Sequence, residues 1–240
     1  MQTTMSLRST PILVAIIAIV TVACLRLGLW QVNRLGERRA ANAISLARRS
    51  LPPLTLDAEA AADTLVDRWV RAAGEFDHAH QVVIRGRVYR ESPGVYVVTP
   101  LRLNGSDTAV LVNRGFVPAS DAITVSLDTL DEPGTRQVTG IAVAIPSGPD
   151  GGVPLVRNGT TTWKRLDLAA LRAQLPYPVL GVSILEAPDS GQPRFPRRLE
   201  PLPLDDGPHL SYAIQWFAFG AIALVGGAIL VTRERDRPRS

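Results

Sequence analysis

The chain has 240 residues, of which 46% are hydrophobic and 20% are charged, and its formal net charge is +4. Its arginines are scattered or lie close to two long apolar segments, which is typical of contacts with lipid headgroups and argues against a nucleic-acid-binding surface. Cys24 is the single cysteine, so an intramolecular disulfide and a cysteine-based metal site are both excluded.

The first predicted element is a membrane-spanning helix over residues 11–30. A helix of this length extends about 30 Å, which matches the hydrocarbon core of a bilayer. Trp30 suits the membrane interface, and Arg26 lies one turn inside it, from where its side chain can reach the headgroups. The alternative is a lipoprotein signal cleaved before Cys24, but Thr21 is a poor residue for such a site and the apolar run continues beyond it.

Residues 33–49 predict a continuation of this helix outside the membrane, ended by Pro52 and Pro53. Short β-branched segments follow, each bounded by glycine, proline or aspartate. They predict strands at 69–76, 81–89, 95–101, 109–113, 137–145 and 178–185, one helix at 166–175, and loops at 128–134 and 146–159. The spacing indicates an antiparallel sheet or a small barrel, so the predicted fold class is α+β.

A second membrane span is predicted over the uncharged residues 210–232, in which Gly226 and Gly227 permit close helix contact. Arginines near the spans divide evenly between the terminal side and the loop side, but the four that follow the second span favour a cytoplasmic C-terminus. The predicted parts are a tail with the first span (1–32), an extracytoplasmic β-rich domain with a proline-rich linker (33–208), the second span (209–232) and a basic cytoplasmic tail (233–240).

Three histidines are candidate metal ligands. His78 and His80 would share one face of an extended segment, but no third ligand is evident and a solvated turn is the favoured interpretation. His209 begins the second span, and helical spacing puts it in one stripe with Tyr212 and Trp216. Neutral imidazole binds haem iron and aromatic rings stack on a macrocycle, although spacing alone favours an ordinary interfacial histidine among aromatic residues.

A hydrolase interpretation would use Ser211 as nucleophile, with His209 and either Asp205 or Asp206. The sequence has no Gly-x-Ser-x-Gly motif, and Ser211 would face a different side of the helix from His209. We therefore do not expect an enzyme.

Six segments, in order along the chain, resemble motifs of the surfeit locus protein 1 family. They are 28–34 (GLWQVNR), 52–54 (PPL), 70–77 (VRAAGEFD), 92–101 (SPGVYVVTPL), 110–118 (VLVNRGFVP) and 209–217 (HLSYAIQWF). The chain departs from the family pattern at Pro208, where asparagine is usual, so the expected polar partner of His209 is missing. It also has Glu37 and Arg38 in place of the aromatic–lysine pair that commonly follows the first motif.

This resemblance implies an assembly factor for haem a-containing cytochrome c oxidase, which aids insertion of haem a into subunit I. It implies transient contact of His209 with the haem iron, beside Tyr212 and Trp216. The implied partners are subunit I, haem a synthase and the lipid bilayer, in a bacterial inner membrane with both termini cytoplasmic. The short lead before the first span also favours a bacterial protein. A scaffold that clamps an oxidase intermediate without haem is the alternative, and a membrane-anchored hydrolase is a remote one.

Other residues of the family pattern are expected to be structural or to contact a partner. They are Trp30, Gln31, Arg34, Gly74, Asn113, Arg114 and Gly115. Gly115 is expected to permit a turn after the predicted strand that ends at Asn113, and a structural corner is favoured over a partner contact there.

Overall fold

The computed structural model describes residues 9–57, 59–146, 154–157 and 160–235. The chain divides into a helical unit, Met1–Ile44 with Leu204–Ser240, and a barrel unit, Ser45–Pro203. Parts of the predicted terminal tails and most of the predicted loop 146–159 lie outside the described residues.

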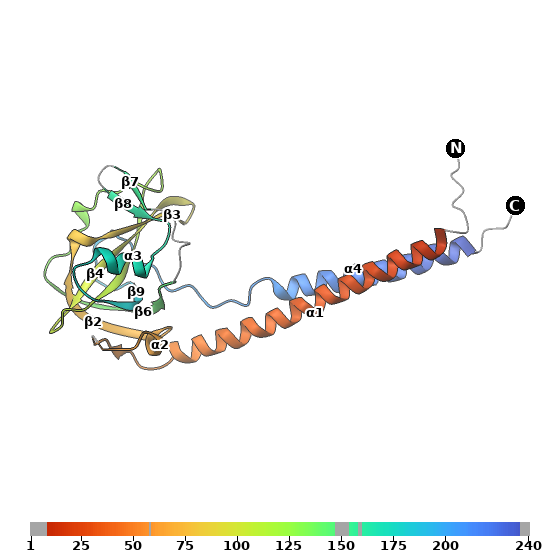
Figure 1. Ribbon diagram of the computed structural model, residues 1–240, viewed down its shortest axis with the longest axis horizontal. Coiled ribbons are helices and arrows are strands. Elements are labelled where there is room, and N and C mark those ends of the chain that lie inside the picture. Colours follow the sequence, from red (N-terminus) through yellow and green to blue (C-terminus); the bar gives the residue numbers. More distant parts are fainter. Residues whose placement is uncertain (1–8, 58, 147–153, 158–159, 236–240) are drawn as a thin grey trace. The chain divides into compact units, whose positions relative to one another are not determined.

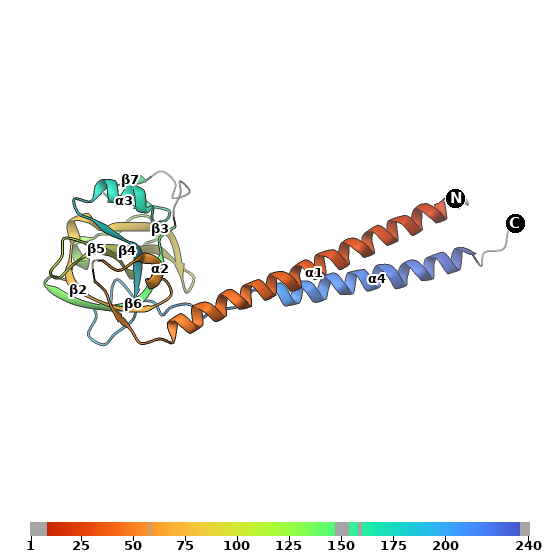
Figure 2. The same ribbon diagram turned by 60° about the horizontal axis from the view of Figure 1, so that its bottom comes forward.

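The helical unit contains α4 (His209–Arg235) and most of α1 (Ser9–Arg49), and the two helices lie side by side in both views (Figures 1 and 2). Because α1 is unbroken, the predicted continuation of the first span is confirmed. In the described residues, both helices are long and apolar enough to cross a membrane, and only 11% of each apolar window is buried. Core helices of soluble proteins are mostly buried, so this exposure favours lipid-facing helices.

The two helices pack antiparallel through small residues. A Cβ atom built on Gly28 of α1 would lie 2.5 Å from the ring of Phe217, and one on Gly227 of α4 would lie 2.6 Å from Ile17. A Cβ atom on Gly226 would meet nothing within 4 Å, so only one of the two predicted contact glycines lies in the interface. On α4 the buried positions Ala213, Gly220 and Gly227 recur every seven residues, as in other close helix pairs.

The barrel unit is built on five strands that close on themselves. The members are β2 (Trp69–Phe76), β4 (Ser92–Leu103), β5 (Ala109–Pro118), β6 (Thr135–Ala144) and β9 (Val179–Glu186). They are hydrogen-bonded in the order β2-β6-β9-β5-β4, and β4 pairs again with β2 (Figure 1). All these pairs are antiparallel except β5–β9, so the predicted small barrel is confirmed.

The other elements extend or cover this barrel. They are β1 (Leu54–Thr55), α2 (Ala62–Leu65), β3 (Val82–Tyr89), β7 (Leu155–Arg157), β8 (Thr160–Trp163), α3 (Leu168–Gln174) and the 3-10 turns η1 (His78–His80) and η2 (Asp128–Leu130). Helix α3 lies in the predicted helical segment, where the Asp167 carboxylate accepts hydrogen bonds from the amides of Ala169 and Ala170. Strand β7 lies inside the segment that was predicted as a loop. Its three residues have no β pattern of their own, and the strand is defined by its pairing with β8.

Apolar side chains from alternate strand positions form the barrel core. In β2 buried residues alternate with exposed or half-buried ones along the whole strand, as expected for a sheet with one face inside. Fully buried core residues include Val70, Leu101, Val110, Val112, Val182 and Ile184. Gly74 permits the closing β2–β4 pair, because a Cβ atom there would lie 2.0 Å from the carbonyl oxygen of Arg102.

Candidate functional site

His209 is the first residue of α4, and Pro208 precedes it directly. The carbonyl of Pro208 accepts hydrogen bonds from the amide of Tyr212, at 3.1 Å, and from the hydroxyl of Ser211, at 2.8 Å. Proline is well suited to a helix start, because its missing N–H is not needed there. The hydroxyl of Ser211 is therefore used by the backbone, and in the described residues it makes no hydrogen bond to His209.

The imidazole of His209 is held by Gln31 of α1. Nδ1 of His209 lies 2.8 Å from Oε1 of Gln31, whose side chain is buried. Because an amide oxygen can only accept, this contact places the proton on Nδ1 and leaves the lone pair of the neutral ring on Nε2. No hydrogen bond to Nε2 occurs in the described part of the chain. Pro208 offers no polar side chain, but Gln31 from the other end of the chain supplies a partner, which corrects the expectation that His209 has none.

The segment before His209 is hydrogen-bonded to α1, the helix that carries Gln31. The Asn42 amide donates to the carbonyl of Asp205 at 2.7 Å, and Nε of Arg39 donates to the Asp206 carboxylate at 2.8 Å. The hydrogen bond from Arg39 holds the pKa of Asp206 below its usual range. Exposed pairs of this kind contribute little to stability, but together they fix the path of the chain into His209.

An open hollow of about 440 Å³ lies beside the imidazole. Its lining residues are Arg34, Glu37, Arg38, Ala41, Gly207 and His209. Arg34 and Glu37 form an exposed ion pair at 2.7 Å. Nε of Arg38 donates a 3.4 Å hydrogen bond to the carbonyl of Asp205. Charged side chains therefore line part of the hollow, and arginine supplies most of its hydrogen-bond donors.

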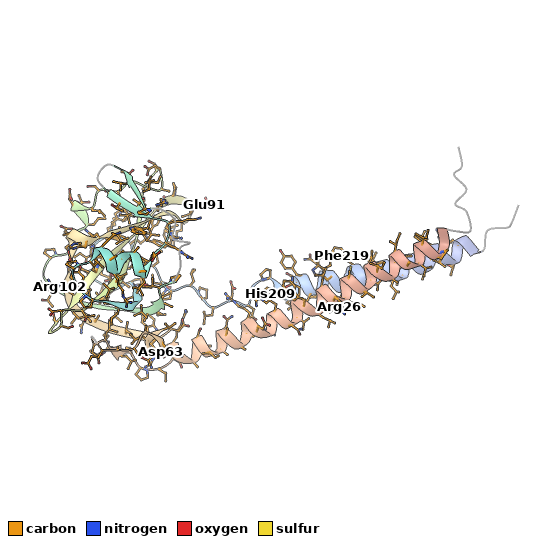
Figure 3. The ribbon with its side chains drawn as sticks, in the orientation of Figure 1. Arg26, Asp63, Glu91, Arg102, His209 and Phe219 are labelled. Atoms are coloured by element: carbon orange, nitrogen blue, oxygen red, sulfur yellow. The ribbon has the colours of Figure 1, made fainter. Side chains whose placement is uncertain are left out.

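Aromatic side chains continue from His209 along α4 at helical spacing. Tyr212 is 46% exposed, Trp216 is half-buried, and the ring of Trp216 lies 6.1 Å from that of Phe219 in an edge-on arrangement. Phe219 was not among the predicted site residues, although it continues the spacing of three and four that joins His209, Tyr212 and Trp216. Figure 3 shows His209 at the start of α4 and Phe219 farther along the same helix. A polar hollow and an apolar stripe thus lie on either side of one imidazole.

The first motif is divided between two faces of α1. Gln31 contacts His209 and Arg34 lines the hollow on the same face, whereas Trp30 is 56% exposed on another face. Neighbouring motif residues therefore face different surroundings.

The second group of motif residues lies in strand β5. Gly115 pairs with Val97 and Asn113 pairs with Val98, so Arg114 is an extra residue that makes a β-bulge. Strand β5 continues to Pro118, which corrects the expected strand end at Asn113 and turn at Gly115. Gly115 has φ +115°, and a Cβ atom there would lie 2.0 Å from the carbonyl oxygen of Arg197. It is needed because the segment around Arg197 crosses β5 at this point.

Arg114 is fully buried at the centre of an ionic network. It donates to the Glu132 carboxylate at 2.6 Å and to the carbonyl of Leu130. The same carboxylate accepts from Arg198 at 2.6 Å, and Arg198 also donates to Glu186 at 2.9 Å. Burial by itself raises the pKa of Glu132, but the hydrogen bonds from Arg114 and Arg198 outweigh it and lower that pKa. The guanidinium of Arg114 is therefore bound by groups of the barrel unit and is not accessible to solvent.

The two remaining histidines belong to turn η1, which confirms a turn there but makes it half-buried rather than solvated. Nδ1 of His80 lies 2.7 Å from the Asp77 carboxylate, and the hydroxyl of Tyr177 donates to the same group at 2.6 Å. Nε2 of His78 accepts from the amide of Glu132. The described residues contain no group of three or more His, Cys, Asp or Glu side chains that could hold a metal ion.

Comparison with known proteins finds one family across most of the chain. The family model described as the SURF1 family matches residues 18–221. A SURF1-like protein from Monosiga brevicollis is 30% identical over 237 residues, which cover 91% of this chain and 87% of the relative. A SURF1-like protein from Rickettsia bellii is 27% identical over 210 residues, covering 83% and 82%. Surfeit locus protein 1 of Xenopus tropicalis is 26% identical over 228 residues, covering 86% and 71%.

Proposed function

Because this chain belongs to the SURF1 family, known as a family of cytochrome c oxidase assembly factors, we propose that it holds haem a as cargo for insertion into subunit I of the oxidase. The observation that carries this proposal is the hydrogen bond between Gln31 and His209, which presents the free lone pair of Nε2. A hydrogen bond to the other ring nitrogen commonly orients an imidazole that binds a metal.

The residues around His209 suit an amphiphilic macrocycle. The iron of haem a supplies an open coordination position, and its ring carries carboxylates at one edge and a long hydrocarbon tail. Arginines line the hollow on one side of His209, and Tyr212, Trp216 and Phe219 continue into the apolar part of α4 on the other. One imidazole ligand is a weak attachment, which suits a carrier that must release its cargo.

The proposal includes a location and partners. Both helices would cross a bacterial inner membrane with the termini in the cytoplasm, and the barrel unit would lie outside the cytoplasm. Subunit I would receive the haem a, and haem a synthase would be its source. In this scheme the protein catalyses no reaction, and its residues bind, orient and release.

The test is the colour of the protein purified in detergent from cells that make haem a. We expect a Soret band that His209→Ala reduces at least about tenfold, because the iron ligand is lost. His80→Ala is the matched control, since His80 lies in the barrel unit and pairs with Asp77. Colourless wild-type and variant proteins at equal yield would refute haem carriage and leave a scaffold that clamps an oxidase intermediate without haem.

A strain that lacks the protein tests the role in assembly separately. We expect selective loss of the haem a band in difference spectra of its membranes, with other cytochromes retained. A normal haem a band in that strain would refute the assembly role itself.

A further inference from the structure

The hollow beside His209 is lined on one side by a single stripe of α1. Gln31, Arg34, Arg38 and Ala41 follow one another at spacings of three, four and three residues, so they share one helix face. Gln31 holds the imidazole, and the two arginines come next along the stripe. The small residues Ala41 and Gly207 leave the hollow open. The face that orients His209 therefore also supplies two guanidinium groups next to it.

These guanidinium groups have unused donors. Arg38 makes one hydrogen bond through Nε, and its two terminal nitrogens make none in the described residues. Arg34 uses only Nη1, in its pair with Glu37. The side chains of that pair are 58% and 64% exposed, so the pair contributes little and can be exchanged for another carboxylate. The lining thus has more donors than acceptors for an oxyanion.

We propose that Arg34 and Arg38 bind the carboxylates of a porphyrin whose iron is bound by His209. This inference rests on the proposed function and adds the anion-binding half of the same site. Arginine is suited to the task, because its planar guanidinium can donate two parallel hydrogen bonds to one carboxylate. With the carboxylates held by the two arginines, Trp216 and Phe219 would be available to contact the apolar part of the ring.

The test uses the full chain in uncharged detergent micelles and a probe without iron, so that it does not depend on His209. The probes are metal-free protoporphyrin, with two free carboxylates, and its dimethyl ester, which has none. Binding is measured by the fluorescence of the porphyrin. We expect the wild type to bind the free acid about tenfold more tightly than the ester, the effect of one or two charge-assisted hydrogen bonds.

Arg38→Gln and Arg39→Gln form a matched pair, because they are adjacent and remove the same charge. Arg39 contacts Asp206 and does not line the hollow. Arg38→Gln, and more so its combination with Arg34→Gln, should bring the preference for the free acid within about twofold of unity, whereas Arg39→Gln should leave that preference unchanged. Arg38→Lys should restore part of it, because charge returns without the planar fork. Thermal melting of each variant separates loss of binding from loss of folding.

Each other outcome counts against the inference. Equal binding of acid and ester by the wild type would overturn it, as would an undiminished preference in the double variant. If the wild type shows no preference but the double variant alone loses affinity for phosphatidylglycerol micelles, the arginines bind lipid phosphate instead. Because the porphyrin probe contains no iron, its binding is measured independently of the iron ligand, so the failure of haem carriage and the failure of carboxylate binding are distinguishable.

Discussion

The amide oxygen of Gln31 lies 2.8 Å from Nδ1 of His209, although 178 positions separate the two residues in the chain. The contact joins the first residue of α4 to the middle of α1 and fixes the tautomer of the imidazole. Both residues belong to motifs near the ends of the chain, and their pairing explains why the two motifs form one site.

Gln31→Leu should leave the histidine in place but free to rotate. We expect the affinity for haem a, measured by titration of the Soret band, to fall about 10-fold to 100-fold, as is usual when a metal-binding histidine loses the hydrogen-bond partner of its other ring nitrogen. Gln215→Leu is the control, because Gln215 is exposed on α4 and changes polarity in the same way. Equal affinities for the two variants would show that the Gln31 contact does not prepare the site.

The antiparallel helix pair can be tested with the native thiol. A Cβ atom at position 220 would lie 3.4 Å from Cβ of Cys24, close to the separation found in disulfides. Gly220→Cys should therefore oxidise to a bond with Cys24, and the two fragments should stay together without reductant after cleavage at a protease site inserted near Gly191. Ala221→Cys, on the exposed side of α4, should not cross-link. The opposite pattern would exclude this pairing of α1 and α4.

Much of the fold could be predicted because the signals are local. Long apolar runs indicate α1 and α4, and β-branched segments between turns indicate β2, β3, β4 and β6. The bulge at Arg114 could not be predicted, because it depends on the register of β5 against β4 and on the segment around Arg197, which lies far away in sequence. Strand β7 was missed for a similar reason, since pairing with β8 defines it.

At the site, spacing along α4 was enough to group His209 with Tyr212 and Trp216. Spacing along α4 cannot reveal the partner of the imidazole, because Gln31 lies on the other helix. The hollow was missed because it needs α1 and the segment before α4 together. The one available signal was the spacing of Gln31, Arg34 and Arg38, which puts them on one helix face.

The buried network in the barrel unit should make stability depend on pH. Because the folded protein lowers the pKa of Glu132, this group stabilises the fold above its ordinary pKa of 4.5, and the contribution is lost as the pH falls through the lowered value. Burial raises the pKa of Glu186, so that group acts in the opposite direction and favours the fold most when protonated.

Glu132→Gln should therefore destabilise the protein by about 3–5 kcal/mol near pH 7, because Arg114 and Arg198 stay buried without their shared carboxylate. It should also reduce the loss of stability below about pH 4.5. Urea unfolding followed by the fluorescence of the buried Trp163 measures both effects. Glu200→Gln, at an exposed position, should change neither. A variant as stable as the wild type at pH 7 would mean that the network is not needed to hold the two arginines.

Gly115 follows the bulged residue Arg114, and comparison with Gly134 separates the cost of a steric clash from the cost of backbone strain. Gly115 and Gly134 both have positive φ, +115° and +82°, but only at Gly115 would a Cβ atom meet another part of the backbone, the carbonyl of Arg197 at 2.0 Å. Gly134→Ala should cost about 1 kcal/mol, from strain alone, whereas Gly115→Ala should cost about 2–4 kcal/mol. Thermal melting of the two variants measures the difference. Because the Arg197 segment also carries Arg198 into the network, Gly115→Ala should further weaken the protection of Glu132 against acid, which Gly134→Ala should not. If both variants melt at the same temperature, β5 can accommodate a side chain at position 115, and the neighbouring segment around Arg197 does not require glycine there.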